Sequence, residues 1–270
     1  MPADSEVFDS HLEAWDEYLT TPWARIRYDV VAHVLDETIA GLCPGPLRVL
    51  DLGGGDGVDS IRLAAAGHEV TIVDQAAGML ERARANSARR GCTDRVRTIE
   101  SDILSWRPDR TYDLVLCHFV LPYLDKGEGQ RRMWRLLHPA VEPDGAASVT
   151  STNPVSEVLS AVHRDGDAEL ALRRFDGQAA YAGMFHHEIH SPRREDVEQT
   201  AVAGGFEVTR RIGLRVAVDL LPDGPAKHDP GAYPAILRLE FALAEEKPYL
   251  DIARAWQLLL HRLPAQTRSG

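Results

Sequence analysis

Short apolar segments alternate with amphipathic stretches along the central part of the chain. Five such segments are dominated by apolar residues, and stretches with helical spacing separate them. Strands that are buried on both faces of a parallel sheet have this character, and helices connect them. The pattern predicts an α/β protein with a doubly wound sheet, with strands at residues 47–52, 69–73, 96–99, 114–117 and 146–150.

Helical patterns flank this core on both sides. Apolar residues recur at helical spacing through residues 6–40, with a break at 20–22. The first helix of the core is expected to begin after Gly57 and to end at Gly67. Near the C-terminus, strands at 206–212 and 256–260 are expected to close the sheet, with a helix between them that contains Ile236, Leu239 and Leu243.

Residues 154–190 interrupt the pattern. This stretch is rich in charge, shows no clear strand pattern and contains Phe175, Tyr181, Met184 and Phe185, which indicates a lid. Ser191 and Pro192 are expected to cap and begin the next helix, because serine is a common N-cap and proline is common at the first helical position. We expect one domain over 1–270, made of an N-terminal helical cap at 1–45, a core at 46–153, the lid at 154–190 and the C-terminal part of the sheet at 191–270.

Composition and charge narrow the possible partners. Hydrophobic residues make up 44% of the 270 positions and charged residues 26%, as in an ordinary globular protein, and three scattered cysteines indicate neither a disulfide framework nor a zinc site. No apolar run is long enough to span a membrane, so we expect a cytoplasmic protein. The net charge of −11 argues against a large nucleic-acid substrate, although a local basic patch remains compatible with it.

A glycine-rich loop, Gly53-Gly54-Gly55-Asp56-Gly57, directly follows the first apolar strand. Glycines at 53, 55 and 57 allow backbone amides to approach a ligand where a Cβ atom would collide. A dinucleotide fingerprint needs glycine at position 58, which is Val58 in this chain. The spacing therefore favours a ligand without phosphates, and a glycine turn with only a folding role is the alternative.

Two acidic residues end the next two strands. Asp74 is placed to accept hydrogen bonds from a ribose diol at the carboxyl edge of the sheet, or to act only as a helix cap. Asp102 ends the third strand and is suited to accept from an adenine amino group, with an ordinary strand-end aspartate as the alternative. Together with the glycine loop, these residues predict a nucleoside site.

The ordered set of motifs over residues 47–150 resembles that of class I S-adenosylmethionine-dependent methyltransferases. It consists of 53–57, Asp74 with Met79-Leu80, Ser101-Asp102, 112–118, 121–124 and 136–145, with Asp144 and Ala146 where many members have glycine. The resemblance implies a Rossmann-like fold with a seven-stranded, mostly parallel sheet, and S-adenosylmethionine as cofactor with S-adenosylhomocysteine as product. It places the cofactor on Arg27, Asp51, Gly53, Gly54, Gly55, Gly57, Asp74, Gln75, Met79, Ser101, Asp102, Ile103 and His118.

Features outside this common core are most similar to bacterial tRNA 5-carboxymethoxyuridine methyltransferases. They include Tyr18, the segment 24–27, His118, the segment 213–216 with Asp219, and the segment 246–249 with Ala253-Arg254. This resemblance implies that Arg27 pairs with the methionyl carboxylate of the cofactor and that His118 lies near the cofactor. The arginine motif has one extra residue, so Arg25 and Arg27 are both candidates for the carboxylate.

Methyl transfer is an in-line displacement that mainly requires alignment of the acceptor with the S–CH3 bond. His118 and Tyr123 are the candidate catalytic residues, with packing against the cofactor or the core as their alternatives. A metal site at His186, Glu188 and His190 lacks an evident fourth ligand, and no metal is predicted. The candidate acceptor-binding residues are Tyr18, Trp23, Tyr181, His186 and Arg215.

These observations lead to three functional hypotheses. The first is a methyltransferase that acts on an oxygen, nitrogen or carboxylate of a small-molecule metabolite. The second is methyl esterification of a tRNA wobble uridine, which the acidity disfavours. The third is a non-methylating catalyst or scaffold that binds the cofactor, and in each case we expect a monomer or homodimer without a membrane partner.

Overall fold

One seven-stranded sheet forms the centre of the molecule. The computed structural model describes residues 11–125, 127–182, 185, 187–222 and 224–263. The strand order is β3-β2-β1-β4-β5-β9-β8. β3, β2, β1, β4 and β5 pair in parallel, whereas β9 is antiparallel to both β5 and β8. The strands are β1 (Arg48–Leu52), β2 (Glu69–Asp74), β3 (Val96–Glu100), β4 (Tyr112–His118), β5 (Val141–Thr152), β8 (Phe206–Leu214) and β9 (Ala255–Arg262).

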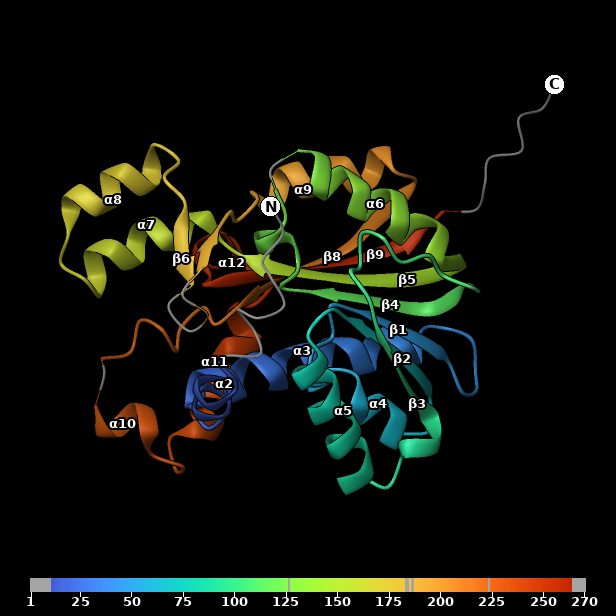
Figure 1. Ribbon diagram of the computed structural model, residues 1–270. Helices are drawn as coiled ribbons and strands as arrows, with labels where there is room; N and C mark the ends of the chain where they lie inside the picture. The colour runs from blue at the N-terminus through green and yellow to red at the C-terminus, as the bar shows by residue number, and fades with distance from the viewer. Residues whose placement is uncertain (1–10, 126, 183–184, 186, 223, 264–270) are drawn as a thin grey trace.

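Helices cover both faces of the sheet (Figure 1). On one face lie α3 (Pro22–Ala40), α4 (Ile61–Ala65), α5 (Ala77–Arg89) and α11 (Tyr233–Leu243), and on the other lie α6 (Glu128–Ala140) and α9 (Arg194–Ala203). The shorter helices outside these layers include α2 (Leu12–Leu19), α8 (Ala168–Phe175), which packs with α7 (Pro154–His163), α10 (Pro225–His228) and α12 (Tyr249–Ile252). No helix in the described ranges is both long and apolar enough to cross a bilayer.

Alternating side chains of the central strands build two separate apolar layers. In β4, Leu114 and Leu116 pack toward α3 and α4, whereas Val115 and Cys117 pack toward α6 and α9. All four side chains are fully buried. Burial of one such side chain stabilises the fold by about 1.5–3 kcal/mol, so the central strands are held from both faces.

The structure confirms the predicted doubly wound, mostly parallel sheet, including the two closing strands. The stretch 154–190, in which the sequence shows no clear strand pattern, has secondary structure of its own. It contains the helices α7 (Pro154–His163) and α8, followed by a hairpin of β6 (Ala180–Ala182) and β7 (His187–Ile189). Strands of three residues are too short to produce a readable alternation of apolar and polar residues.

The predicted start of the helix after the lid was wrong. α9 begins at Arg194, and its N-cap is Arg193 rather than Ser191. The Ser191 hydroxyl instead hydrogen-bonds the Thr152 hydroxyl at the end of β5, so it is not available to cap a helix. The helix ends at Ala203, and Gly204 is its C-cap.

Asn153 joins the lid to the sheet. Its Oδ1 accepts from the Val155 amide at the start of α7 at 3.1 Å. Its Nδ2 donates to the carbonyl oxygens of Asp251 and Ala253, both at 2.9 Å. We predict that Asn153→Ala lowers the free energy of unfolding by about 3 kcal/mol, because a helix cap and two buried hydrogen bonds are lost.

Asn153→Ser keeps a capping hydroxyl and serves as the control, with an expected loss about 1 kcal/mol smaller. Urea unfolding followed by circular dichroism measures both variants. A loss below about 0.5 kcal/mol for Asn153→Ala would contradict this role.

Candidate cofactor-binding site

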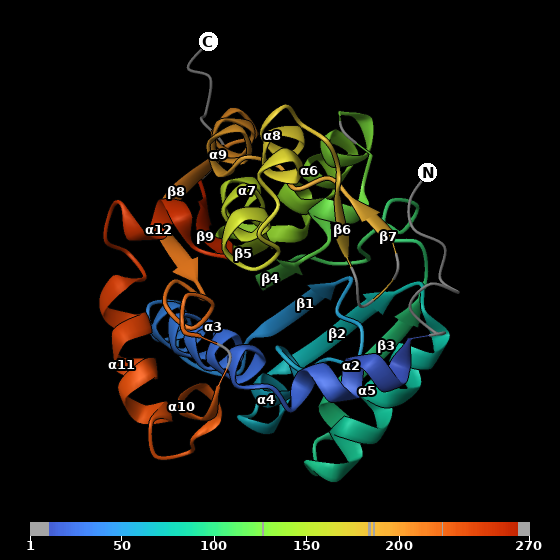
Figure 2. The same cartoon turned by 90° about the vertical axis from the view of Figure 1, so that its left-hand side faces the viewer.

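A cavity is lined by residues at the carboxyl ends of β1, β2 and β4, by Trp15 of α2 and by Phe185 of the lid. Figure 2 shows how α2 and the hairpin of β6 and β7 are arranged around this edge of the sheet. Most of the predicted cofactor residues line the cavity. They are Arg27, Asp51, Gly53, Gly54, Gly55, Asp74, Gln75, Met79, Asp102, Ile103 and His118, and Tyr123 lines the same space. Gly57 and Ser101 do not line the cavity, but Gly57 shapes the loop and the Ser101 amide donates to the Asp74 carbonyl at 2.8 Å.

Backbone rather than side chains forms the floor of the cavity at the glycine loop. Gly53, Gly55 and Gly57 have φ angles of +68°, +54° and +73°, which residues with a Cβ atom rarely adopt. A Cβ atom on Gly54 would lie 2.4 Å from the carboxyl carbon of Asp51. The loop therefore requires glycine for conformation and for space. The amides of Gly53, Gly55 and Gly57 donate within the protein, to the Val73 carbonyl, the Asp74 carboxylate and the Gly54 carbonyl.

Asp74 connects this loop to the second strand. Its Oδ2 accepts from the Gly55 amide at 2.9 Å, and its Oδ1 accepts from the Ala76 amide at 2.9 Å. The bond to Ala76 lies just before α5 and resembles the alternative role of Asp74 as a helix cap. No side chain accepts a capping hydrogen bond from the first turn of α5 itself. Each carboxylate oxygen has a second lone pair, so the predicted role of Asp74 in binding a ribose diol stays compatible with these bonds.

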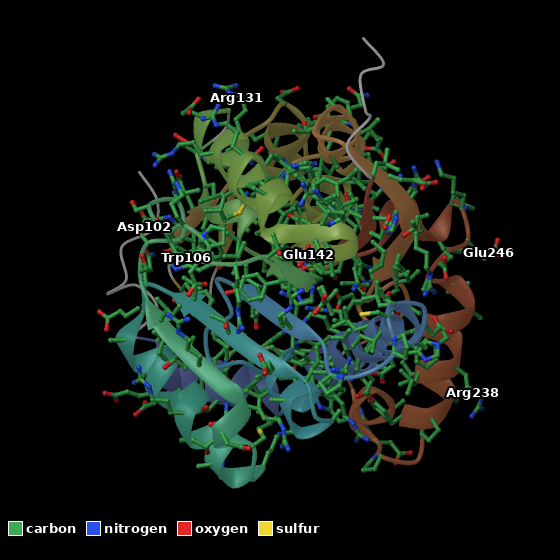
Figure 3. The ribbon with its side chains drawn as sticks, turned by 90° about the vertical axis from the view of Figure 1, so that its right-hand side faces the viewer. Asp102, Trp106, Arg131, Glu142, Arg238 and Glu246 are labelled. Atoms are coloured by element: carbon green, nitrogen blue, oxygen red, sulfur yellow. The ribbon has the colours of Figure 1, made fainter. Side chains whose placement is uncertain are left out.

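Asp102 holds the turn after β3. Its Oδ1 accepts from the Leu104 amide at 2.9 Å and its Oδ2 accepts from the Ser105 hydroxyl at 2.7 Å. Asp102 and Trp106 lie beside each other in this turn (Figure 3), where the Trp106 amide donates to the Asp102 carbonyl at 2.9 Å. The structure thus gives Asp102 a local role, and its contact with an adenine stays a prediction.

Arg27 places a buried positive charge in the cavity wall. The guanidinium carbon lies 3.9 Å from the ring centre of Tyr28 and 4.8 Å from that of Phe119. Its Nε is buried without a hydrogen-bond partner in the part of the chain that the structure describes. Phe119 has a φ angle of +56°, a strained conformation for an aromatic residue that holds its ring beside Arg27.

Arg25, the other candidate for the cofactor carboxylate, lies elsewhere. Its side chain is 63% exposed, pairs with Asp29 at 3.9 Å and packs on the Tyr233 ring. Arg27 is only 7% exposed and lines the cavity. The structure therefore favours Arg27 as the group that receives an anionic part of the ligand.

The cavity wall is otherwise strongly acidic. Burial raises the pKa of Asp51 to about 7, against the opposing effect of His118. Burial also raises the pKa of Asp56, whose Oδ2 accepts from Trp15 Nε1 at 2.8 Å. These carboxyls, with Asp59, Asp74 and Asp102, suit a ligand that carries positive charge and oppose a pyrophosphate.

His118 lies at the end of β4 with both ring nitrogens engaged. Nδ1 is 2.9 Å from Asp59 Oδ2, and Nε2 is 2.8 Å from the Ser148 hydroxyl. Burial raises the pKa of Asp59, but the hydrogen bond from His118 and nearby positive charge outweigh it and hold the pKa below its ordinary value. This arrangement favours a packing and positioning role for His118 over general-base catalysis.

Aromatic side chains close the cavity from above. Phe185 stacks on Trp15 with ring centres 6.1 Å apart and contacts Tyr123 edge-on at 6.3 Å. Burial raises the pKa of the Tyr123 hydroxyl well above its ordinary value, which opposes a tyrosinate base. Trp15, Tyr28, Asp56, Asp59 and Phe119 also line the cavity. The sequence did not indicate them, because their spacing matches ordinary core or turn positions.

The predicted acceptor-binding residues do not gather in this cavity. Tyr18 contacts Trp15 from α2, and Trp23 packs against His228 at 5.9 Å. Tyr181 is 53% exposed on β6, and Arg215 pairs with Asp219 at 2.6 Å. His186 and Met184 lie outside the described residues, and the residues that are described contain no group of three or more potential metal ligands.

The chain is similar to known proteins in sequence and in fold. A family model described as a methyltransferase domain matches residues 49–145. The chain is 26% identical over 242 residues to the tRNA 5-carboxymethoxyuridine methyltransferase of Escherichia coli strain K12, and the match covers 87% of each chain. It is 29% identical over 107 residues to the ubiquinone biosynthesis O-methyltransferase of Rickettsia conorii, which covers 40% of this chain and 35% of the relative.

The solved structure of magnesium protoporphyrin IX methyltransferase from Synechocystis PCC 6803 with bound SAH has the same fold. Its TM-score is 0.61 at 17% identity, and the match covers 94% of each chain. This likeness confirms the Rossmann-like methyltransferase architecture expected from the sequence motifs.

We predict that Gly54→Ala weakens binding of S-adenosylmethionine at least about tenfold, because the new methyl group would displace the Asp51 carboxylate beneath the loop. Isothermal titration calorimetry measures the dissociation constant. Gly224→Ala is the matched control, because Gly224 has an extended φ of −176° and no atom within 4 Å of an added Cβ. Equal affinity for the two variants would contradict the close-approach role of Gly54.

We also predict that affinity for S-adenosylmethionine increases as the pH rises from 6 to 8. A cationic ligand favours the ionised form of Asp51, so binding lowers a pKa that is about 7 in the free protein and releases a proton near neutral pH. Calorimetry in buffers of different ionisation enthalpy measures this release. Asp51→Asn should remove the pH dependence. A wild-type affinity that stays constant between pH 6 and pH 8 would contradict the role of Asp51.

Proposed function

We propose that this chain, a class I S-adenosylmethionine-dependent methyltransferase, transfers a methyl group to an oxygen, nitrogen or carboxylate acceptor on a small-molecule metabolite. The observation that carries the proposal is the cavity, whose lining combines a backbone floor at the glycine loop with the buried Arg27, a residue whose Nε has no hydrogen-bond partner among the described residues. The acidic wall supports a cofactor that bears a sulfonium and an ammonium group.

The residues around the cavity fit such a cofactor. The backbone of the glycine loop and the guanidinium of Arg27 would contact its amino-acid part, and Asp74 and Asp102 would hold the nucleoside. When bound, S-adenosylmethionine supplies an electrophilic methyl group on its sulfonium. The aromatic cover of Trp15, Tyr123 and Phe185 would exclude water from the reacting atoms.

The surroundings of His118 and Tyr123, the two candidate bases, favour a methyl acceptor that needs no deprotonation. His118 uses both ring nitrogens, and burial opposes ionisation of Tyr123. A carboxylate or neutral amine needs no deprotonation before displacement, so alignment alone would suffice. Packing and positioning roles for His118 and Tyr123 are therefore favoured over roles as catalytic bases.

Surface charge supports a small acceptor. Many arginines are neutralised by carboxylates, as in the pairs of Arg48 with Asp113 and Glu142. Arg210 pairs in the same way with Glu37 and Glu245. A protein that tracks a phosphate backbone needs unpaired positive charge, and the net charge of this chain is −11.

A tRNA wobble uridine is the alternative acceptor. It is favoured by the Escherichia coli relative, whose match extends beyond the cofactor core to 87% of both chains. A non-methylating catalyst or a scaffold that binds the cofactor is the second alternative. Turnover to S-adenosylhomocysteine separates this second alternative from both methyltransferase hypotheses.

We predict that the purified protein transfers label from methyl-labelled S-adenosylmethionine to a small-molecule extract but not to bulk tRNA. Arg27→Met is the matched control and should reduce transfer at low cofactor concentration by about tenfold or more, because it removes the cationic partner of the cofactor carboxylate. Scintillation counting of separated fractions measures the transfer. Labelled tRNA without any labelled metabolite would overturn the choice of acceptor.

A further inference from the structure

We propose that Asp59 binds the ammonium group of the cofactor's amino-acid moiety, and that His118 is the positioning residue that holds Asp59 in the cavity wall. The inference rests on the proposed function, because it concerns recognition of S-adenosylmethionine. With Arg27 opposite the carboxylate, the cavity would then recognise both charges of the zwitterion.

The carboxylate of Asp59 is preorganised to bind a cation. It lies in the turn between the glycine loop and α4, and its side chain is only 14% exposed. One carboxylate oxygen, Oδ2, is bound by His118. The other, Oδ1, accepts no hydrogen bond from the residues that the structure describes, while Asp59 lines the same cavity as Arg27.

A chain of buried hydrogen bonds orients this carboxylate. Gln257 Nε2 donates to the Ser148 hydroxyl at 2.9 Å, and both side chains are fully buried. The ionised carboxylate of Asp59 can only accept a hydrogen bond, so its contact with His118 places a proton on Nδ1. With one proton on the ring, Nε2 then accepts from the Ser148 hydroxyl, which is 2.8 Å away.

The chain crosses three neighbouring strands, from Gln257 on β9 through Ser148 on β5 to His118 on β4. The core of the sheet thereby fixes the side chain of Asp59, which itself belongs to a turn. A carboxylate held in this way loses little conformational entropy when it binds a ligand.

The other carboxyls near the loop are less suited to an ammonium group. Asp56 accepts from the Trp15 indole, and Asp74 accepts from two backbone amides. Asp51 is 2% exposed beneath the loop, and its pKa of about 7 leaves it partly protonated at neutral pH. Asp59 combines a lowered pKa with an open oxygen.

Calorimetry with four nucleosides tests the assignment of Asp59. They are S-adenosylmethionine, S-adenosylhomocysteine, decarboxylated S-adenosylmethionine, which keeps the ammonium, and 5′-methylthioadenosine, which lacks the whole amino-acid group. Asp59→Asn should weaken the first three by about tenfold or more and methylthioadenosine by less than about twofold.

Arg27→Met provides the complementary comparison, because it should weaken S-adenosylmethionine and S-adenosylhomocysteine but not the decarboxylated compound. Asp59→Asn that weakens all four ligands equally, or none of them, would overturn the assignment. A wild-type protein that binds none of the four would instead overturn the proposed function.

Two variants of His118 test the positioning role. The Asn amide in His118→Asn can replace Nδ1 as donor to Asp59, whereas the longer Gln side chain in His118→Gln reaches toward Ser148. We expect affinity for S-adenosylhomocysteine within about threefold of the wild type for Asn and at least about tenfold weaker for Gln. Equal losses in the two variants would contradict positioning through Nδ1.

Nitrogen-15 NMR of the imidazole adds a readout that a merely structural residue would not give. The assignment predicts a protonated Nδ1 and an unprotonated Nε2 in wild-type protein. It also predicts that Ser148→Ala changes the Nε2 signal. A proton found on Nε2 alone would overturn the hydrogen-bond chain.

Discussion

The approach of bare backbone to the ligand at residues 53–57 is the constraint on which the remainder of the site depends. The Gly53 amide donates to the Val73 carbonyl at 2.7 Å, and the Gly55 amide donates to Asp74. These bonds attach the loop to β2, so its conformation follows from the pairing of the first two strands. Asp51 fills the space beneath the loop that a side chain on Gly54 would need. The loop, the ribose-binding candidate and the adjacent strands therefore form one unit.

Much of this unit could be predicted from the sequence because each part has a local signal. Apolar runs flanked by glycine located the parallel strands, and the spacing of Gly53, Gly55 and Gly57 distinguished the loop from a dinucleotide fingerprint. The lid was less predictable, since strands of three residues carry no readable period. The start of α9 was missed because Ser191 bonds Thr152, a residue 39 positions away, instead of the local backbone.

The electrostatic character of the site could not be predicted from local patterns. Arg27 and Arg25 are two residues apart on one helix, and only packing places one in the cavity and the other against Tyr233. Asp59 and His118 are likewise 59 positions apart and meet only because β4 lies beside β1. Contacts of this kind decide which aspartates keep their charge. They place a buried cation, Arg27, among carboxyls in the cavity wall, an arrangement that suits a zwitterionic, sulfonium-bearing cofactor.

The central claim is that the glycine loop and the first three strand ends bind a phosphate-free nucleoside. An amide NMR titration of labelled protein with S-adenosylhomocysteine tests it most directly. The account predicts saturable shifts concentrated at residues 53–59, 74–75 and 102–103, with one ligand bound per chain. Unchanged amide signals at saturating ligand, or shifts confined to residues distant from this edge of the sheet, would contradict it.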